Sequence, residues 1–139
     1  MSKLKPHQNK TVEEYWMSLS ELKEQLEFRE WQLLNEWRET DTNTGGGRSS
    51  GTSDKTAQAA IKLAEDERYQ HLKKVINAIE STYKTIDDEM KTMVKMRYWF
   101  DKIQPEWEEI ADVLYMSRNK VLRMRNYLID ETAKKIGWL

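Results

Sequence analysis

The sequence predicts an all-α protein with long N-terminal helices and a C-terminal domain of shorter ones. Only five glycines and two prolines occur in 139 residues, whereas Glu, Lys, Leu, Met, Arg and Gln, which favour helices, are plentiful. No Asn-Gly or Asp-Gly pair stands between alternating strand patterns. Apolar residues recur instead at helical spacing along most of the chain.

Two long helices are expected in the N-terminal half. Thr11 begins the letters TVEE, which resemble a capping box, so a helix is predicted over 12–38 after a frayed segment 1–10. A second helix is predicted over 55–85, capped by Ser53 or Asp54. Three tryptophans of the first region suit either the core or a protein interface: Trp16, Trp31 and Trp37.

A glycine-rich segment, 39–54, separates these two helices and holds all but one of the glycines. A phosphate-binding loop needs Lys after its closing Gly and a strand before the loop, but Gly51 precedes Thr52 and no strand is predicted. A connector is therefore the favoured interpretation. The predicted organisation is a helical arm, 1–38, a Gly-rich linker or loop, 39–54, and a helical DNA-binding domain, 55–139.

Three shorter helices complete the predicted chain. Asp87 is expected to cap one whose Met-rich apolar stripe suits the core or, alternatively, an adaptable binding groove. Pro105 suits the first position of the next, predicted over 105–114. The last is expected after Ser117, over 117–136, with Gly137 as its stop.

The lengths of the last two predicted helices and of the turn between them are typical of a helix-turn-helix, placed at 105–136: a helix of about eight residues, a turn of three to four, and a second helix. Ala111 provides the small side chain that closely crossing helices require. Apolar residues are expected to fill the angle between them: Ile110, Leu114, Val121 and Met124. A left-handed residue is needed at Tyr115, where a bulky side chain costs about 1 kcal/mol or more unless the turn differs.

The outer face of the second helix carries side chains suited to DNA. Arg pairs bidentately with guanine, Asn with adenine, and Leu touches the thymine methyl, while flanking cations suit phosphates. The predicted DNA-binding residues are Ser117, Arg118, Asn119, Lys120, Leu122, Arg123, Arg125 and Asn126. Upstream acids are expected to orient the domain without cancelling this face: Glu106, Glu108, Glu109 and Asp112.

Composition excludes several other classes. The formal net charge of −1 excludes a uniformly basic coat, and the absence of Cys excludes thiol catalysis, disulfides and Cys-based zinc sites. No apolar run approaches the roughly 20 residues of a membrane span, so a soluble intracellular protein is expected. Only His7 and His71 are available for acid–base work, and the adjacent acid pairs diverge on a helix, so neither an enzyme nor a cofactor is expected.

Several motifs together resemble the RinA family of phage transcriptional regulators. They are GGGRSSG at 45–51, VINAIE at 75–80, MRYW at 96–99, WEEIA at 107–111, and the residues Ser117, Arg118, Arg123 and Arg125. The similarity covers most of the chain from about residue 28, and departs at Asn119 and Met124, where Arg and an aromatic residue are common in the family. The C-terminal part also resembles region 4 of sigma factors.

The resemblance implies a sequence-specific activator of phage late genes, which encode packaging and structural proteins, acting on promoter DNA in the bacterial host cytoplasm. It also suggests contact with host RNA polymerase. Because helix-turn-helix proteins often dimerise on two-fold sites, a homodimer is a further expectation. Two alternatives stay open: a DNA-packaging protein akin to a small terminase subunit, and a helical interaction module that binds no DNA.

Overall fold

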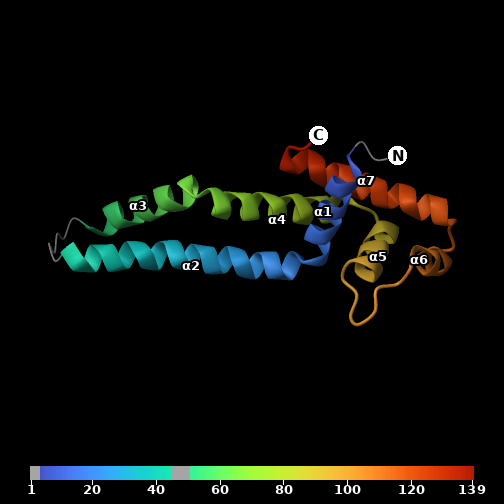
Figure 1. Ribbon diagram of the computed structural model, residues 1–139, viewed down its shortest axis with the longest axis horizontal. Helices are drawn as coiled ribbons and strands as arrows, with labels where there is room; N and C mark the ends of the chain where they lie inside the picture. The colour runs from blue at the N-terminus through green and yellow to red at the C-terminus, as the bar shows by residue number, and fades with distance from the viewer. Residues whose placement is uncertain (1–3, 45–50) are drawn as a thin grey trace. The chain divides into compact units, whose positions relative to one another are not determined.

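The protein is all-α, as predicted. The computed structural model describes the backbone of residues 4–44 and 51–139, and the side chains of these except 36–44 and 51–54. Seven helices and no strand lie within those ranges (Figure 1). They are α1 Pro6–Met17, α2 Leu19–Thr44, α3 Gly51–Glu65, α4 Glu67–Thr85, α5 Asp88–Arg97, α6 Trp107–Leu114 and α7 Arg118–Ile136. No helix in this part of the chain combines the length and apolarity that crossing a membrane requires.

Contacts gather the chain into two compact units. The terminal unit is Met1–Leu19 with Val75–Leu139, and the central unit is Ser20–Lys74. The predicted division at residues 38 and 54 stays a prediction. Residues 39–44 and 51–54 of the predicted Gly-rich connector are helical, at the end of α2 and the start of α3, and 45–50 lie outside the described residues. The first 19 residues belong with the C-terminal helices because Val12 and Trp16 of α1 are fully buried there.

The predicted helix over 12–38 is wrong, because the chain forms two helices that meet at Ser18. The hydroxyl of Ser18 donates to the Glu14 carbonyl, and its backbone (φ −105°, ψ 24°) ends α1. The capping box at Thr11 is wrong too: α1 begins at Pro6, and the Thr11 hydroxyl donates to the His7 carbonyl inside it (2.9 Å). Residues 6–10, predicted to be frayed, are therefore helical.

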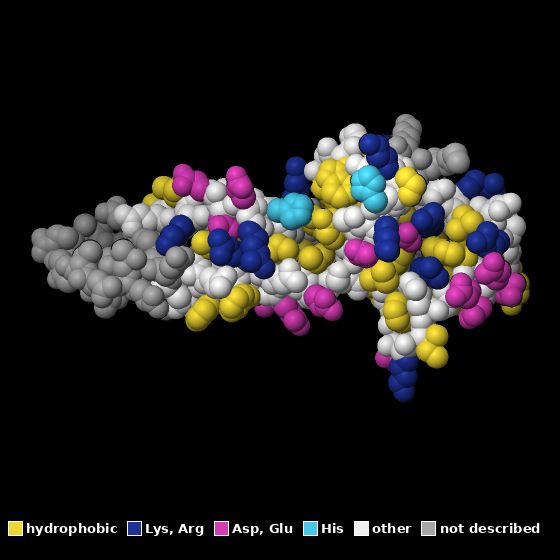
Figure 2. Space-filling view, in the orientation of Figure 1, with side chains coloured by type: hydrophobic (Ala, Val, Ile, Leu, Met, Phe, Trp, Pro, Cys, Tyr) yellow, Lys and Arg dark blue, Asp and Glu magenta, His cyan; other side chains and the backbone are white. Residues whose placement is uncertain are grey.

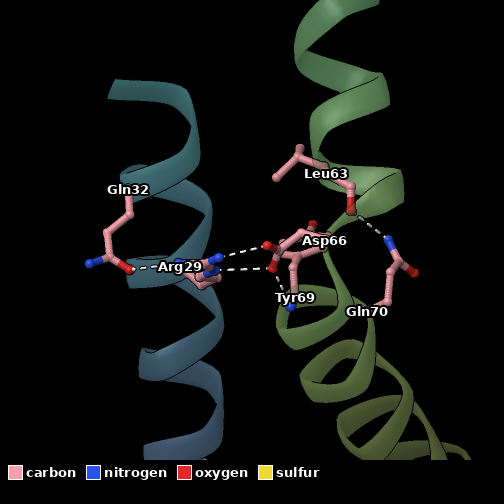
Figure 3. Close-up of polar contacts among 6 residues, drawn as sticks. All are labelled: Arg29, Gln32, Leu63, Asp66, Tyr69 and Gln70. Atoms are coloured by element: carbon pink, nitrogen blue, oxygen red, sulfur yellow. Dashed lines mark hydrogen bonds and ion pairs between the residues drawn. The ribbon is translucent and has the colours of Figure 1, made fainter. Parts of the chain in front are cut away.

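The predicted helix over 55–85 is also divided, at Asp66. The Asp66 carboxylate accepts hydrogen bonds from Arg29 of α2 (Nε 3.0 Å, Nη2 2.6 Å) and from the Tyr69 backbone N–H (2.7 Å), so it starts α4 and holds it to α2 (Figure 3). The predicted single helix is therefore interrupted at Asp66, where the side chain bonds Arg29 and the start of α4: α3 ends at Glu65 and α4 begins at Glu67. α3 begins at Gly51, so the predicted caps Ser53 and Asp54 lie inside its first turn, and their side chains are outside the described part.

The core of the terminal unit explains how α7 is held. Its fully buried apolar residues larger than alanine come from every helix of the unit: Val12, Trp16, Val75, Ile79, Met93, Val94, Ile110, Val121, Leu128 and Ile129. Met93 shows that the Met-rich stripe of α5 is largely core. The Asp87 cap is confirmed, because its carboxylate accepts from the Met90 N–H (2.8 Å).

The loop between α5 and α6 is fixed at its base by Arg97. The guanidinium Nη1 donates to the Pro105 carbonyl (2.7 Å), and the group lies 4.5 Å from the centre of the Trp107 ring. Pro105 therefore stays in the loop, and α6 begins at Trp107 rather than at 105 as predicted. This clamp sets where α6 starts relative to α5.

The predicted tryptophan anchors have different environments. Trp16 is core, with its indole N–H donating to the Thr132 hydroxyl (3.0 Å). Trp31 lies on α2, is 59% exposed and stacks on Phe28 with ring centres 6.0 Å apart. The side chain of Trp37 lies outside the described residues.

Candidate nucleic-acid interface

A compact helix–turn–helix is formed by α6 and α7. Helix α6 ends in a Schellman motif: Tyr115 is left-handed (φ 56°, ψ 45°), its N–H bonds the Asp112 carbonyl (3.3 Å), and the Met116 N–H bonds the Ala111 carbonyl (3.0 Å). Ser117 then caps α7 by accepting from the Lys120 N–H (3.1 Å). The predicted turn, left-handed position and cap are confirmed, as is the stop at Gly137 (φ 100°).

Two of the four residues predicted to fill the angle between the two helices are buried there, as is the small residue predicted at their crossing. Ile110 and Val121 are fully buried, and Ala111 is 3% exposed where the helices cross. Leu114 and Met124 are also predicted to fill this angle, but both are only half-buried, and Met124 lines a surface groove. One residue advances about 100° around a helix, and the buried side of α7 centres on Val121, Leu128 and Thr132, which leaves Met124 at its edge.

The predicted DNA-binding residues do not share one environment. Ser117, Arg118, Asn119, Lys120 and Arg123 are exposed, whereas Leu122, Arg125 and Asn126 are half-buried. Arg123 lies at the centre of the exposed side of α7, opposite the buried stripe, and Asn119 and Lys120 lie one turn before it on either side. Within the part of the chain that the structure describes, neither Lys120 nor Arg123 forms an ion pair with an acid.

Arg125 points into the protein and does not flank the exposed face. Its Nη2 pairs with Glu13 of α1 (2.9 Å), and its Nη1 donates to the Asn126 side chain (3.3 Å). The Tyr98 hydroxyl donates to the other Glu13 oxygen (2.8 Å), and burial together with the Glu13 charge raises the pKa of Tyr98. Arg125 thus anchors α7 to α1, a role that the linear sequence did not reveal because Glu13 lies 112 residues away.

Arg118 has an acidic partner at the surface. Its Nε lies 2.8 Å from a Glu108 oxygen, and both side chains are more than half exposed (51% and 64%). The expectation that the α6 acids leave the basic face uncompensated is therefore wrong for this pair, because the fold brings the first turn of α6 to the start of α7. Exposed pairs of this kind contribute little to stability, so Glu108 holds the Arg118 guanidinium only weakly.

Acidic and basic side chains are separated over this part of the surface. Figure 2 shows acidic groups gathered over α6, with Lys or Arg groups over the adjoining end of α7.

Both His7 and His71 are exposed on helices, α1 and α4. Across the described ranges, no three His, Asp or Glu side chains cluster as metal ligands would.

A family model described as "Protein of unknown function (DUF722)" matches residues 9–134 of the chain. No curated protein and no solved structure matches the chain.

Proposed function

The chain belongs to the DUF722 family, and we propose that it is a transcription regulator that binds double-stranded DNA through α7. The proposal rests on one observation above all: a capped helix–turn–helix presents Asn119, Lys120 and Arg123 to solvent at the start of its second helix. A helix of this kind enters the major groove with its N-terminal residues against the base edges. The family description names no function, so the support comes from the site.

Each exposed side chain has a distinct task in the proposed complex. Arg123 donates two hydrogen bonds to guanine, Asn119 recognises adenine, and Lys120 contacts phosphate. The Ser117 oxygen accepts from the helix, which leaves its O–H free to donate to a phosphate. Arg118 exchanges Glu108 for phosphate, while Arg125 stays with Glu13 and takes no direct part.

We further propose that the DNA is a late promoter of a phage, that the protein activates packaging and structural genes in the bacterial cytoplasm, and that it contacts host RNA polymerase. This part rests on the motifs shared with the RinA regulators and with sigma region 4. A homodimer on a two-fold site belongs to the same proposal. A small-terminase-like packaging protein would instead assemble as a ring, which native mass spectrometry distinguishes.

DNA binding is tested by selecting duplexes from a random pool and titrating the selected site by fluorescence anisotropy. Arg123→Ala is expected to weaken specific binding by about 1–3 kcal/mol and to relax preference at one base pair. Lys120→Ala is expected to weaken all sequences alike and to lower the salt slope by about 1. The matched control is Lys135→Ala, which removes an exposed cation from the far end of α7.

The proposed function fails if no sequence is enriched, or if Lys135→Ala weakens binding as much as Arg123→Ala. The second outcome would mean that general positive charge, and not the start of α7, attracts the DNA. If the protein is instead a helical interaction module that binds no DNA, Arg123→Ala and Lys120→Ala are both expected to retain full function in the cell. Circular dichroism confirms that each variant is folded, since all three side chains are exposed.

A further inference from the structure

A surface groove runs beside the proposed DNA face, between α7 and the corner that joins α4 to α5. Its volume is about 520 Å³, within the range of about 300–1,000 Å³ that ligand pockets have. All of its lining belongs to the terminal unit: Thr85, Ile86, Asp87, Met90, Lys120, Arg123, Met124 and Tyr127.

The floor of the groove is apolar and adaptable. Ile86 and Met90 are buried beneath it, at 6% and 8% exposed, and Met124 is half-buried. Tyr127 leaves 52% of its surface open to solvent, although it is a large aromatic residue. Methionine side chains adjust to differently shaped partners, and an exposed Tyr is a frequent anchor at protein interfaces.

The charged groups of the groove favour an anionic partner. Lys120 and Arg123 pair with no acid in the described part of the chain. The one carboxylate in the lining, Asp87, is already engaged, because it accepts from the Met90 N–H and caps α5. The lining therefore carries two cations without an acidic partner and one acid whose charge remains, which gives the groove a net charge of +1.

The spacing of these cations matches the spacing of acidic side chains on a helix. Lys120 and Arg123 are three residues apart on α7, so their Cβ atoms lie about 5–6 Å apart along one helix face. Two acidic residues three or four positions apart on another helix have the same spacing. Apolar residues on that same helix would reach the Met and Tyr side chains below, which is the helix-in-groove mode of recognition.

We propose that this groove binds an amphipathic, acidic helix of a partner protein. Its carboxylates pair with Lys120 and Arg123, and its apolar side chains pack on Met90, Met124 and Tyr127. Because the same two cations serve the proposed DNA face, the bound helix excludes DNA and switches the regulator off. The docking stands independently of the proposed function, and only the exclusion of DNA rests on it.

The docking is tested with a random peptide library displayed on phage and selected on the full-length protein. The enriched peptides are expected to combine Asp or Glu with Leu, Phe or Trp at helical spacing. Tyr127→Ala is expected to weaken the best peptide at least about tenfold, and Arg123→Glu more strongly still. Tyr115→Ala is the matched control, since Tyr115 is 96% exposed and lies outside the groove.

Three results would overturn the docking. The first is a selection that enriches no acidic peptide, and the second is a loss of peptide affinity in Tyr115→Ala as large as that in Tyr127→Ala. The third is a dimer that Tyr127→Ala dissociates, as measured by sedimentation. The last result would mean that a second copy of this chain occupies the groove.

Competition separates this inference from the proposed function. The selected peptide is expected to displace the selected duplex from the wild-type protein, and a peptide that binds the groove while DNA stays bound overturns the exclusion. Asn119→Ala lies outside the groove, so it is expected to weaken DNA and leave the peptide affinity unchanged. If the protein binds the selected peptide but no DNA in any measurement, the proposed function is wrong and the docking of the helix still stands.

Discussion

Tyr115 adopts a backbone conformation that glycine usually takes. Among the non-glycine residues that the structure describes, it alone has a positive φ (56°). The left-handed region costs an L-residue about 1–2 kcal/mol. The side chain is 96% exposed, so burial does not offset this cost. The turn keeps Tyr115 left-handed because the Schellman hydrogen bonds to Ala111 and Asp112 depend on that conformation.

Tyr115→Gly is therefore expected to stabilise the protein by about 0.5–1 kcal/mol, since glycine relieves the strain but loses more chain entropy on folding. The free energy of unfolding in urea measures the change. Tyr115→Ala keeps a Cβ and the strain with it, so no gain is expected there. An equal gain from both variants would show that the Tyr side chain, rather than the backbone, is the unfavourable feature.

At the scale of elements, the joint between α3 and α4 depends on one carboxylate. Hydrogen bonds from the Arg29 side chain and the Tyr69 N–H lower the pKa of Asp66 below its ordinary value. A second bond closes the joint, because the Gln70 side chain donates to the Leu63 carbonyl (2.9 Å; Figure 3). The ionised form of Asp66 therefore holds α2 against the start of α4.

The stability that Asp66 contributes should depend on pH in a defined direction. A lowered pKa means that the contribution is complete above the ordinary value of 3.8 and disappears as the pH falls below it. Thermal melts of wild type and Asp66→Asn are expected to differ near neutral pH and to converge in acid. Asp112→Asn, at an exposed position on α6, should reproduce the wild-type curve. A constant difference between wild type and Asp66→Asn at all pH values would contradict the assignment.

At the scale of the whole chain, the terminal unit is assembled from both ends of the sequence. Trp16 of α1 is fully buried, its indole N–H donates to Thr132 of α7, and its carbonyl accepts from the Trp99 indole (2.9 Å). Glu13 of the same helix joins Tyr98 and Arg125. Helix α1 is thus part of the structure that holds the proposed DNA-binding helix.

Trp16→Ala is expected to destabilise the terminal unit by about 3–5 kcal/mol, because it leaves a large cavity and removes the N–H from which the Thr132 hydroxyl accepts, although that hydroxyl still donates to the Leu128 carbonyl. Urea unfolding followed by circular dichroism gives the value. The control is Trp31→Ala on α2, where a 59% exposed ring is removed and a loss below about 1.5 kcal/mol is expected. Similar losses in the two variants would argue against the buried role of Trp16.

Local signals account for the features that were predicted well. The caps at Asp87 and Ser117 and the stop at Gly137 each depend on a few neighbouring residues whose types favour them, so their letters are sufficient to place them. Breaks inside apolar runs are different. Ser18 interrupts a pattern that reads as one helix, and Asp66 interrupts another through a partner 37 residues away.

By itself, then, the sequence determined an all-α chain, the start of α7 and the turn before it, because helix propensity, capping and periodicity act over a few residues. Only the tertiary structure decided that α1 packs on α7, that Arg125 points inward to Glu13, and that Met124 opens onto a groove. Helical periodicity tells which residues share a face, but which face is covered depends on contacts between distant segments.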